Sequence, residues 1–137
     1  MNTKAVIVSA VAYTMGTFVL AVLWHVVLFK SQYEGFGYFE GEPNFLLGLV
    51  TIAIQGTILS VLFPLFRLSG TPILRSLKFC SLVGIFFWTS HVLAFMAKQT
   101  INNAVAFAVM ESFYLLLQFG LFAVMLGIIY RHEKPGA

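Results

Sequence analysis

The sequence predicts an all-α membrane protein in which four transmembrane helices form an antiparallel bundle with both termini in the cytoplasm. Three observations predict this fold class. Hydrophobic residues make up 60% of the 137 residues and charged residues only 9%, whereas soluble domains average roughly 45–50% and 25%. The charges interrupt four long apolar runs, each able to supply the roughly 20 residues that cross a bilayer. Lys and Arg also gather on one side of the resulting topology.

We expect a single integral membrane domain, residues 1–137, with helices over about 5–29, 45–66, 76–97 and 104–130. The first helix ends at Lys30. The second ends near Pro64, because proline inside a helix removes a backbone hydrogen bond. Thr71 is a candidate N-cap for the third helix, and the fourth follows a short turn after Lys98.

The longest predicted loop, 31–44, is rich in glycine and proline, which is typical of turns. We expect it to lie along the membrane surface, with its aromatic rings at the level of the lipid headgroups. These rings belong to Tyr33, Phe36, Tyr38 and Phe39.

The distribution of Lys and Arg predicts the orientation. The termini and the middle loop hold six of them, namely Lys4, Arg67, Arg75, Lys78, Arg131 and Lys134. The first and third loops hold only Lys30 and Lys98. The termini are therefore predicted to be cytoplasmic, and the first loop, which carries Glu34, Glu40 and Glu42, to face outward. This predicts a multi-pass protein of the cell's inner (plasma) membrane.

Composition also limits the partners and the chemistry. The net charge of +3 and the pI near 9.2 do not indicate nucleic acid, because the basic residues stand singly beside apolar spans. Cys80 is the only cysteine, so one chain can form neither an internal disulfide nor a Cys-x-x-Cys redox pair. No motif specifies a reaction, so no enzyme class is predicted. The expected partners are the bilayer, a second copy of the chain or another membrane protein.

A few polar residues inside the spans are the candidate functional residues. Ionisable groups there cost about 2.5–3.5 kcal/mol at the span centre, so each suggests a function. From the 1.5 Å rise per residue we place the four candidates about 7 to 16 Å inside the outer ends of their helices. They are His25, Gln55, His91 and Glu111, one from each helix. We therefore expect a shared polar cluster in the outer half of the bundle.

This cluster allows three kinds of function. A Glu and His pair can exchange a proton near neutral pH, which suits proton-linked transport or binding of a small molecule or ion. His25, His91 and Glu111 are also candidate ligands of a divalent metal, and the two histidines of a haem. No cofactor is specified by a motif. The remaining alternative is a structural or assembly partner whose polar residues only join helices by hydrogen bonds.

Two resemblances accompany these hypotheses. Trp24-His25-x-x-Leu28-Phe29-Lys30-x-x-Tyr33, Glu42-Pro43 and Ile54-Gln55-Gly56 resemble a group of small bacterial four-helix inner-membrane proteins that bring no known activity with them. Within the chain, the segment from Trp24 to Lys30 is similar to that from Trp88 through His91 to Lys98. This internal similarity reflects either a duplicated helical hairpin or a chance match between short apolar sequences.

Overall fold

The computed structural model describes residues 2–39 and 41–132, so Glu40 and Lys134 of the charge analysis lie outside it. The described part is helical and contains no strand. Its elements are α1 (Thr3–Ala21), η1 (Val22–Leu28), α2 (Lys30–Phe36), α3 (Phe45–Leu65), α4 (Pro72–Trp88), η2 (Thr89–Leu93), α5 (Ala94–Lys98) and α6 (Ala104–Ile129). The segments η1 and η2 are π-helical and continue α1 and α4 without a break.

Four of the resulting helices are long and apolar enough to cross a membrane, which confirms the predicted all-α membrane class at this level. They cover Thr3–Leu28, Phe45–Leu65, Pro72–Lys98 and Ala104–Ile129. The third begins at Pro72 rather than near 76. The predicted cap at Thr71 is confirmed, since its Oγ1 accepts a hydrogen bond from the amide of Leu74 at 3.4 Å. Pro72 extends the helix to that point because proline is favoured at the first helical position.

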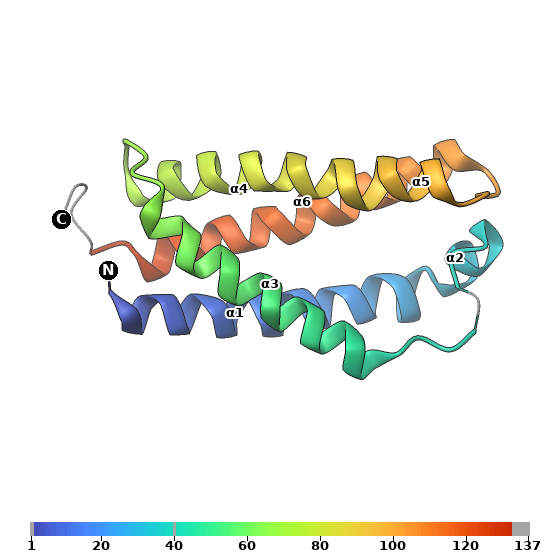
Figure 1. Ribbon diagram of the computed structural model, residues 1–137, viewed down its shortest axis with the longest axis horizontal. Coiled ribbons are helices and arrows are strands. Elements are labelled where there is room, and N and C mark those ends of the chain that lie inside the picture. The colour runs from blue at the N-terminus through green and yellow to red at the C-terminus, as the bar shows by residue number, and fades with distance from the viewer. Residues whose placement is uncertain (1, 40, 133–137) are drawn as a thin grey trace.

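The four long helices share one core, to which each contributes buried residues. α1 packs against both α3 and α6, and α4 packs on α6. In Figure 1 the start of α1 and the end of α6 lie together at the left, and α3 crosses α1 obliquely. We call the left end of this view the terminal end, and the right end, which holds α2 and α5, the loop end.

The oblique path of α3 closes the terminal end and opens the loop end. At the terminal end Phe63 of α3 makes edge contacts with Phe79 of α4 and Tyr130, which follows α6, with ring centroids 5.3 and 4.9 Å apart. Gly56 marks the crossing with α1. A Cβ atom on it would lie 2.8 Å from the Tyr13 ring and 3.1 Å from the carbonyl oxygen of Ala10. Beyond Gly56, toward its own start, α3 diverges from α4.

The loop that precedes α3 is not a surface layer. It contains the short helix α2, which ends at Gly37 in the left-handed conformation, with a φ of 74°. The expectation that its aromatic rings face the headgroups is wrong for Tyr33, with 0% exposure, and Phe36, with 7%. Both pack into the protein because the loop folds back over the ends of the helices. The amide of Asn102 donates to the carbonyl oxygen of Phe36 at 3.1 Å and thereby ties α2 to the turn before α6.

Gly56→Ala tests the close crossing of α1 and α3. Alanine adds up to about 1 kcal/mol of helix propensity, but its Cβ must displace a packed ring and a backbone carbonyl. Overpacking of this kind costs about 1–3 kcal/mol. We expect a lower free energy of unfolding, measured by thermal or denaturant unfolding in detergent. The control is Gly48→Ala in the same helix, where a Cβ meets nothing within 4 Å; equal stability changes in the two variants would contradict the crossing.

Candidate functional site

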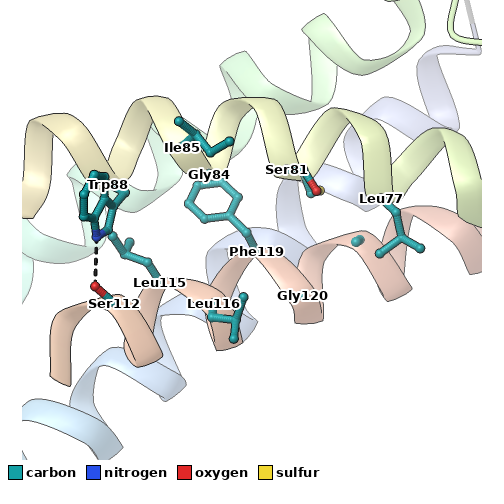
Figure 2. A pocket seen from close by; sticks show the side chains of 12 residues that line it. Leu77, Ser81, Gly84, Ile85, Trp88, Ser112, Leu115, Leu116, Phe119 and Gly120 are labelled. Atoms are coloured by element: carbon teal, nitrogen blue, oxygen red, sulfur yellow. Dashed lines mark hydrogen bonds between the residues drawn. The ribbon is translucent and has the colours of Figure 1, made fainter. Parts of the chain in front are cut away.

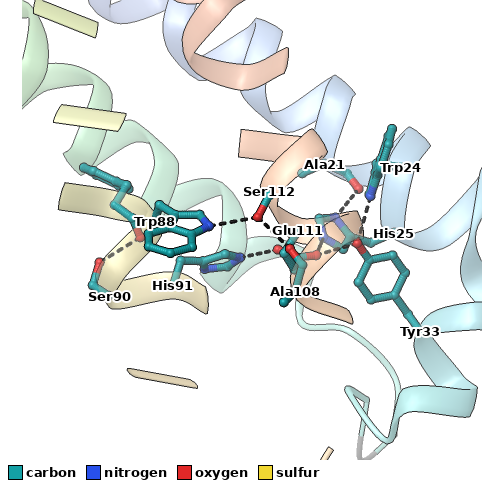
Figure 3. A network of polar contacts seen from close by, with 11 residues as sticks. Ala21, Trp24, His25, Tyr33, Trp88, Ser90, His91, Ala108, Glu111 and Ser112 are labelled. Carbon is teal, nitrogen blue, oxygen red and sulfur yellow. Dashed lines mark hydrogen bonds and ion pairs between the residues drawn. The ribbon is translucent and has the colours of Figure 1, made fainter. Parts of the chain in front are cut away.

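The centre of the site is Glu111, on α6, whose side chain is fully buried with 0% exposure. Its Oε1 lies 2.9 Å from Nε2 of His25, and its Oε2 lies 2.7 Å from Nε2 of His91. The hydroxyl of Tyr33 on α2 also donates to Oε1. Figure 3 shows these side chains converging from η1, α2, η2 and α6. We call His25, Tyr33, His91 and Glu111 the Glu111 cluster.

Of the four predicted site residues, the structure brings His25, His91 and Glu111 together through direct hydrogen bonds from each histidine to the carboxyl group. Gln55 does not join them. Within the described part of the chain it takes part in no hydrogen bond of the cluster, and it lies instead along a neighbouring cavity. The reason is the oblique path of α3, which carries Gln55 away from α6.

Both histidines lie in π-helical segments, His25 in η1 and His91 in η2. In such segments an amide bonds the carbonyl five residues back, as the amide of Phe29 does with Trp24 at 3.1 Å. One extra residue enters the turn, so the side chains rotate relative to the α-helical face. Short π-helical segments within α-helices are frequently found at functional sites. The two segments of internal sequence similarity therefore also share a local backbone form.

The hydrogen bonds of His25 fix where its protons are. Nδ1 lies 3.0 Å from the carbonyl oxygen of Ala21, and a carbonyl only accepts, so Nδ1 carries a proton. If the imidazole is neutral, Nε2 only accepts, and the bond to Glu111 needs a proton on Oε1. If it is an imidazolium, Nε2 donates to a carboxylate. In both forms one proton lies between Nε2 and Oε1. His25 and Glu111 therefore form a pair with no net charge.

Tyr33 and Trp24 complete the surroundings of Oε1. The indole N–H of Trp24 donates to the hydroxyl oxygen of Tyr33 at 2.8 Å, which directs the hydroxyl proton to Glu111. Burial raises the pKa of Tyr33 far above its ordinary value of 10.0, and the charge of Glu111 raises it further. Tyr33 therefore remains a neutral donor. Sequence reasoning missed this role, because a tyrosine in a glycine-rich loop gives no sign of folding back onto a helix.

His91 differs from His25 in its access to solvent or ligand. Its side chain is 37% exposed, against 11% for His25. No hydrogen bond in the described part engages its Nδ1. Beside it, the indole N–H of Trp88 donates to Oγ of Ser112 at 2.8 Å, and Ser112 donates to the carbonyl of Ala108 at 2.6 Å. His91 can therefore gain or lose a proton on Nδ1 while its Nε2–H continues to donate to Glu111.

A cavity of about 520 Å³ lies next to the cluster, between the diverging halves of α1 and α3. Its floor is formed by buried residues, including His25, Tyr114 and Gln118, and by His91. Its mouth is formed by exposed residues at the start of α3, among them Phe45 and Leu47. A volume of this size is typical of small-molecule sites.

A second, smaller hollow contains none of the residues of the Glu111 cluster. It measures about 380 Å³ and lies between α4 and α6, where Figure 2 shows Phe119 against Gly84. A Cβ on Gly84 would come within 3.3 Å of that ring. Apart from Cys80, the described residues that line it hold no side chain that ionises below about pH 10. Its polar features are the hydrogen bond from Trp88 to Ser112, the hydroxyl of Ser81 and the thiol of Cys80.

The geometry gives no support to the metal and haem alternatives. Across residues 2–39 and 41–132, no group of three His, Cys, Asp or Glu side chains is arranged to hold a metal ion. The Nε2 atoms of both histidines are directed at the carboxylate oxygens of Glu111. The arrangement is that of a hydrogen-bonded chain of imidazole, carboxyl and imidazole. Such a chain can hold, share and exchange protons.

No known family model, curated protein or solved structure matches this chain.

A tyrosinate titration tests the enclosure of the loop aromatics. Burial and, second, the charge of Glu111 raise the pKa of both Tyr33 and Tyr38. A raised pKa means that the stability from the neutral phenol is complete below about pH 10 and is lost as pH rises above it. At about pH 11 the folded wild type and the folded Tyr33→Phe variant should give the same tyrosinate absorbance. After unfolding, the wild type should show the absorbance of about one more tyrosinate than the variant. Tyr38→Phe should give the same result when it is compared with the wild type. A smaller signal in either folded variant would contradict the enclosure.

Proposed function

We propose that the protein is a multi-pass protein of the inner (plasma) membrane, with its four spans antiparallel and its termini cytoplasmic. Six Lys and Arg on the side of the termini against two on the other side support this orientation. The meeting of the start of α1 with the end of α6 in Figure 1 fits an even number of crossings. In this orientation the Glu111 cluster lies in the outer half of the membrane.

We propose that the Glu111 cluster is a proton-exchanging site that serves proton-linked transport or binding of a small molecule in the adjacent cavity. The observation that carries this proposal is the buried carboxyl of Glu111, held between one imidazole with a fixed Nδ1 proton and one that is partly exposed. A group with no access to solvent or to the cavity could not exchange protons. A fully exposed group would not need three hydrogen-bond partners.

The cluster has two states that differ by one proton. In the first, His25 and Glu111 share a proton and His91 is neutral, so the net charge is zero. In the second, Nδ1 of His91 is also protonated and the net charge is +1. The carboxylate stabilises this added charge, because an isolated imidazolium would be costly in a low-dielectric site. The charge changes beside the cavity, so a ligand there is coupled to the proton.

A structural role is the second candidate, and one observation favours it. The same hydrogen bonds join η1, α2, η2 and α6, so the cluster fixes four segments whether or not it exchanges protons. Interhelical hydrogen bonds in membranes contribute about 0.6 kcal/mol on average. In this case the cluster would serve only to hold the protein, or an assembly of which it is part, in one conformation.

Glu111→Gln distinguishes the two roles, because it keeps the shape of the side chain and removes its charge. Without the carboxylate the imidazolium of His91 loses its stabilising partner, so the variant should take up about one proton fewer than the wild type between about pH 8 and 5. The measurement is potentiometric titration of the purified protein in weakly buffered detergent. The matched control is Glu34→Gln, the same change at an exposed carboxyl on α2. Equal proton uptake by wild type and Glu111→Gln in a folded state would favour the structural role.

A further inference from the structure

The cavity beside the cluster has an unusual electrostatic character. Among the described residues that line it, none is Asp, Glu, Lys or Arg. The lining residues that become charged near neutral pH are His25 and His91. Since His25 and Glu111 together carry no net charge, protonation of His91 decides the charge of the cavity wall. The wall is therefore either neutral or positive.

Two further polar groups on the cavity wall, the hydroxyl of Tyr114 and the amide of Gln55, have no hydrogen-bond partner among residues 2–39 and 41–132. Tyr114 is 5% exposed and makes ring contacts with His25 and His91, with centroids 4.5 and 6.5 Å apart. In the described part of the chain no hydrogen bond engages its hydroxyl or the amide of Gln55. Gln55 is half-buried, and the hydroxyl of Tyr114 retains accessible surface, so both groups can be reached from the cavity. A ligand that accepts hydrogen bonds would satisfy both.

The rest of the cavity is apolar and leads away from these groups. Phe18 and Val22 form one wall, Ile52 lies on α3, and the mouth is at Phe45 and Leu47, which are 46% and 62% exposed. These mouth residues begin a membrane-spanning helix. A molecule that follows this path has its polar group at His91 and its apolar part toward the lipid.

We propose that the cavity binds an amphipathic organic acid, whose carboxylate lies at His91 and Tyr114 and whose apolar chain extends between α1 and α3 to the membrane. This inference rests on the proposed function and names its ligand class. An acid fits because the wall becomes positive and offers donors. An organic cation does not fit, because the carboxylate of Glu111 is fully buried behind the two imidazoles.

This assignment makes binding depend on pH in a defined direction. The ionised acid binds best when Nδ1 of His91 is protonated, so each ligand bound brings one proton with it. While the acid is ionised, affinity therefore rises as pH falls. We expect the dissociation constant to be about tenfold lower at about pH 6 than at about pH 8.

Fluorescence quenching can measure this binding, because Trp24 packs against Tyr114, with centroids 6.3 Å apart, and Trp88 lies close to the cluster. The full-length protein in zwitterionic nanodiscs is titrated with three ten-carbon chains that carry bromine. They bear a carboxylate, a trimethylammonium or a hydroxyl group. The carboxylate should quench saturably and with the stated pH dependence. The other two should quench only as they partition into the lipid, without saturation.

Variants assign the effect to residues. His91→Gln should abolish the pH dependence of carboxylate binding, and Ser90→Ala, its neighbour outside the cavity, should keep it. Tyr114→Phe removes one hydroxyl and should weaken binding about three- to tenfold with the pH dependence intact. It provides the test if His91→Gln does not fold. Carboxylate binding that Tyr114→Phe leaves unchanged would overturn the proposed position of the headgroup.

The outcomes separate this inference from the function on which it rests. Saturable binding of the ammonium chain in preference to the carboxylate would overturn the ligand class. Absence of saturable binding by all three chains would also overturn it, although the proton-exchanging site would stand if Glu111→Gln still lowered proton uptake. If Glu111→Gln left proton uptake unchanged, the proposed function itself would fail. Carboxylate binding that requires His91 and strengthens at lower pH supports the inference.

Discussion

The arrangement of the loop end of this protein depends on a single carboxyl group that is buried among apolar helices. Glu111 has no exposed surface, and a charge in such a place is tolerated only when partners surround it. Two imidazoles and a phenol supply those partners, and each comes from a different segment. The positions of η1, η2 and α2 are therefore linked through one side chain. A change at Glu111 affects all three.

The same segments show how local structure adapts to this requirement. An α-helix would place the two histidines on faces set by its regular turn, but both lie in π-helical segments that rotate their rings. The terminal end of the molecule is held together by aromatic packing instead. There Phe63, Phe79 and Tyr130 pack edge to face, and α3 reaches them by crossing α1 at Gly56. The cavity follows from this crossing, because the first half of α3 diverges from the second half of α1 beyond it.

The sequence predicts the helices well and the site only in part. Charge-free runs determine where spans begin and end to within a few residues, because the cost of burying charges is large and local. The proximity of His25, His91 and Glu111 follows from comparable depths in neighbouring helices. Tyr33 could not be predicted, because its position depends on a loop that folds back by tertiary contacts. Depth alone predicts that Gln55 joins the cluster, but equal depth in two helices does not guarantee contact between their side chains. The tilt of α3 and the π-helical turns have no periodic signal in the sequence.

Nitrogen-15 NMR of the protein with labelled histidine rings tests most directly the central claim that one proton is shared between His25 and Glu111 while His91 exchanges another. The account predicts that Nδ1 of His25 remains protonated from about pH 8 to 5, since it donates to Ala21 throughout. Nδ1 of His91 should become protonated over the same range, and Glu111→Gln should suppress that change. An unprotonated Nδ1 on His25, or protonation of Nδ1 of His91 that Glu111→Gln leaves unchanged, would contradict the claim.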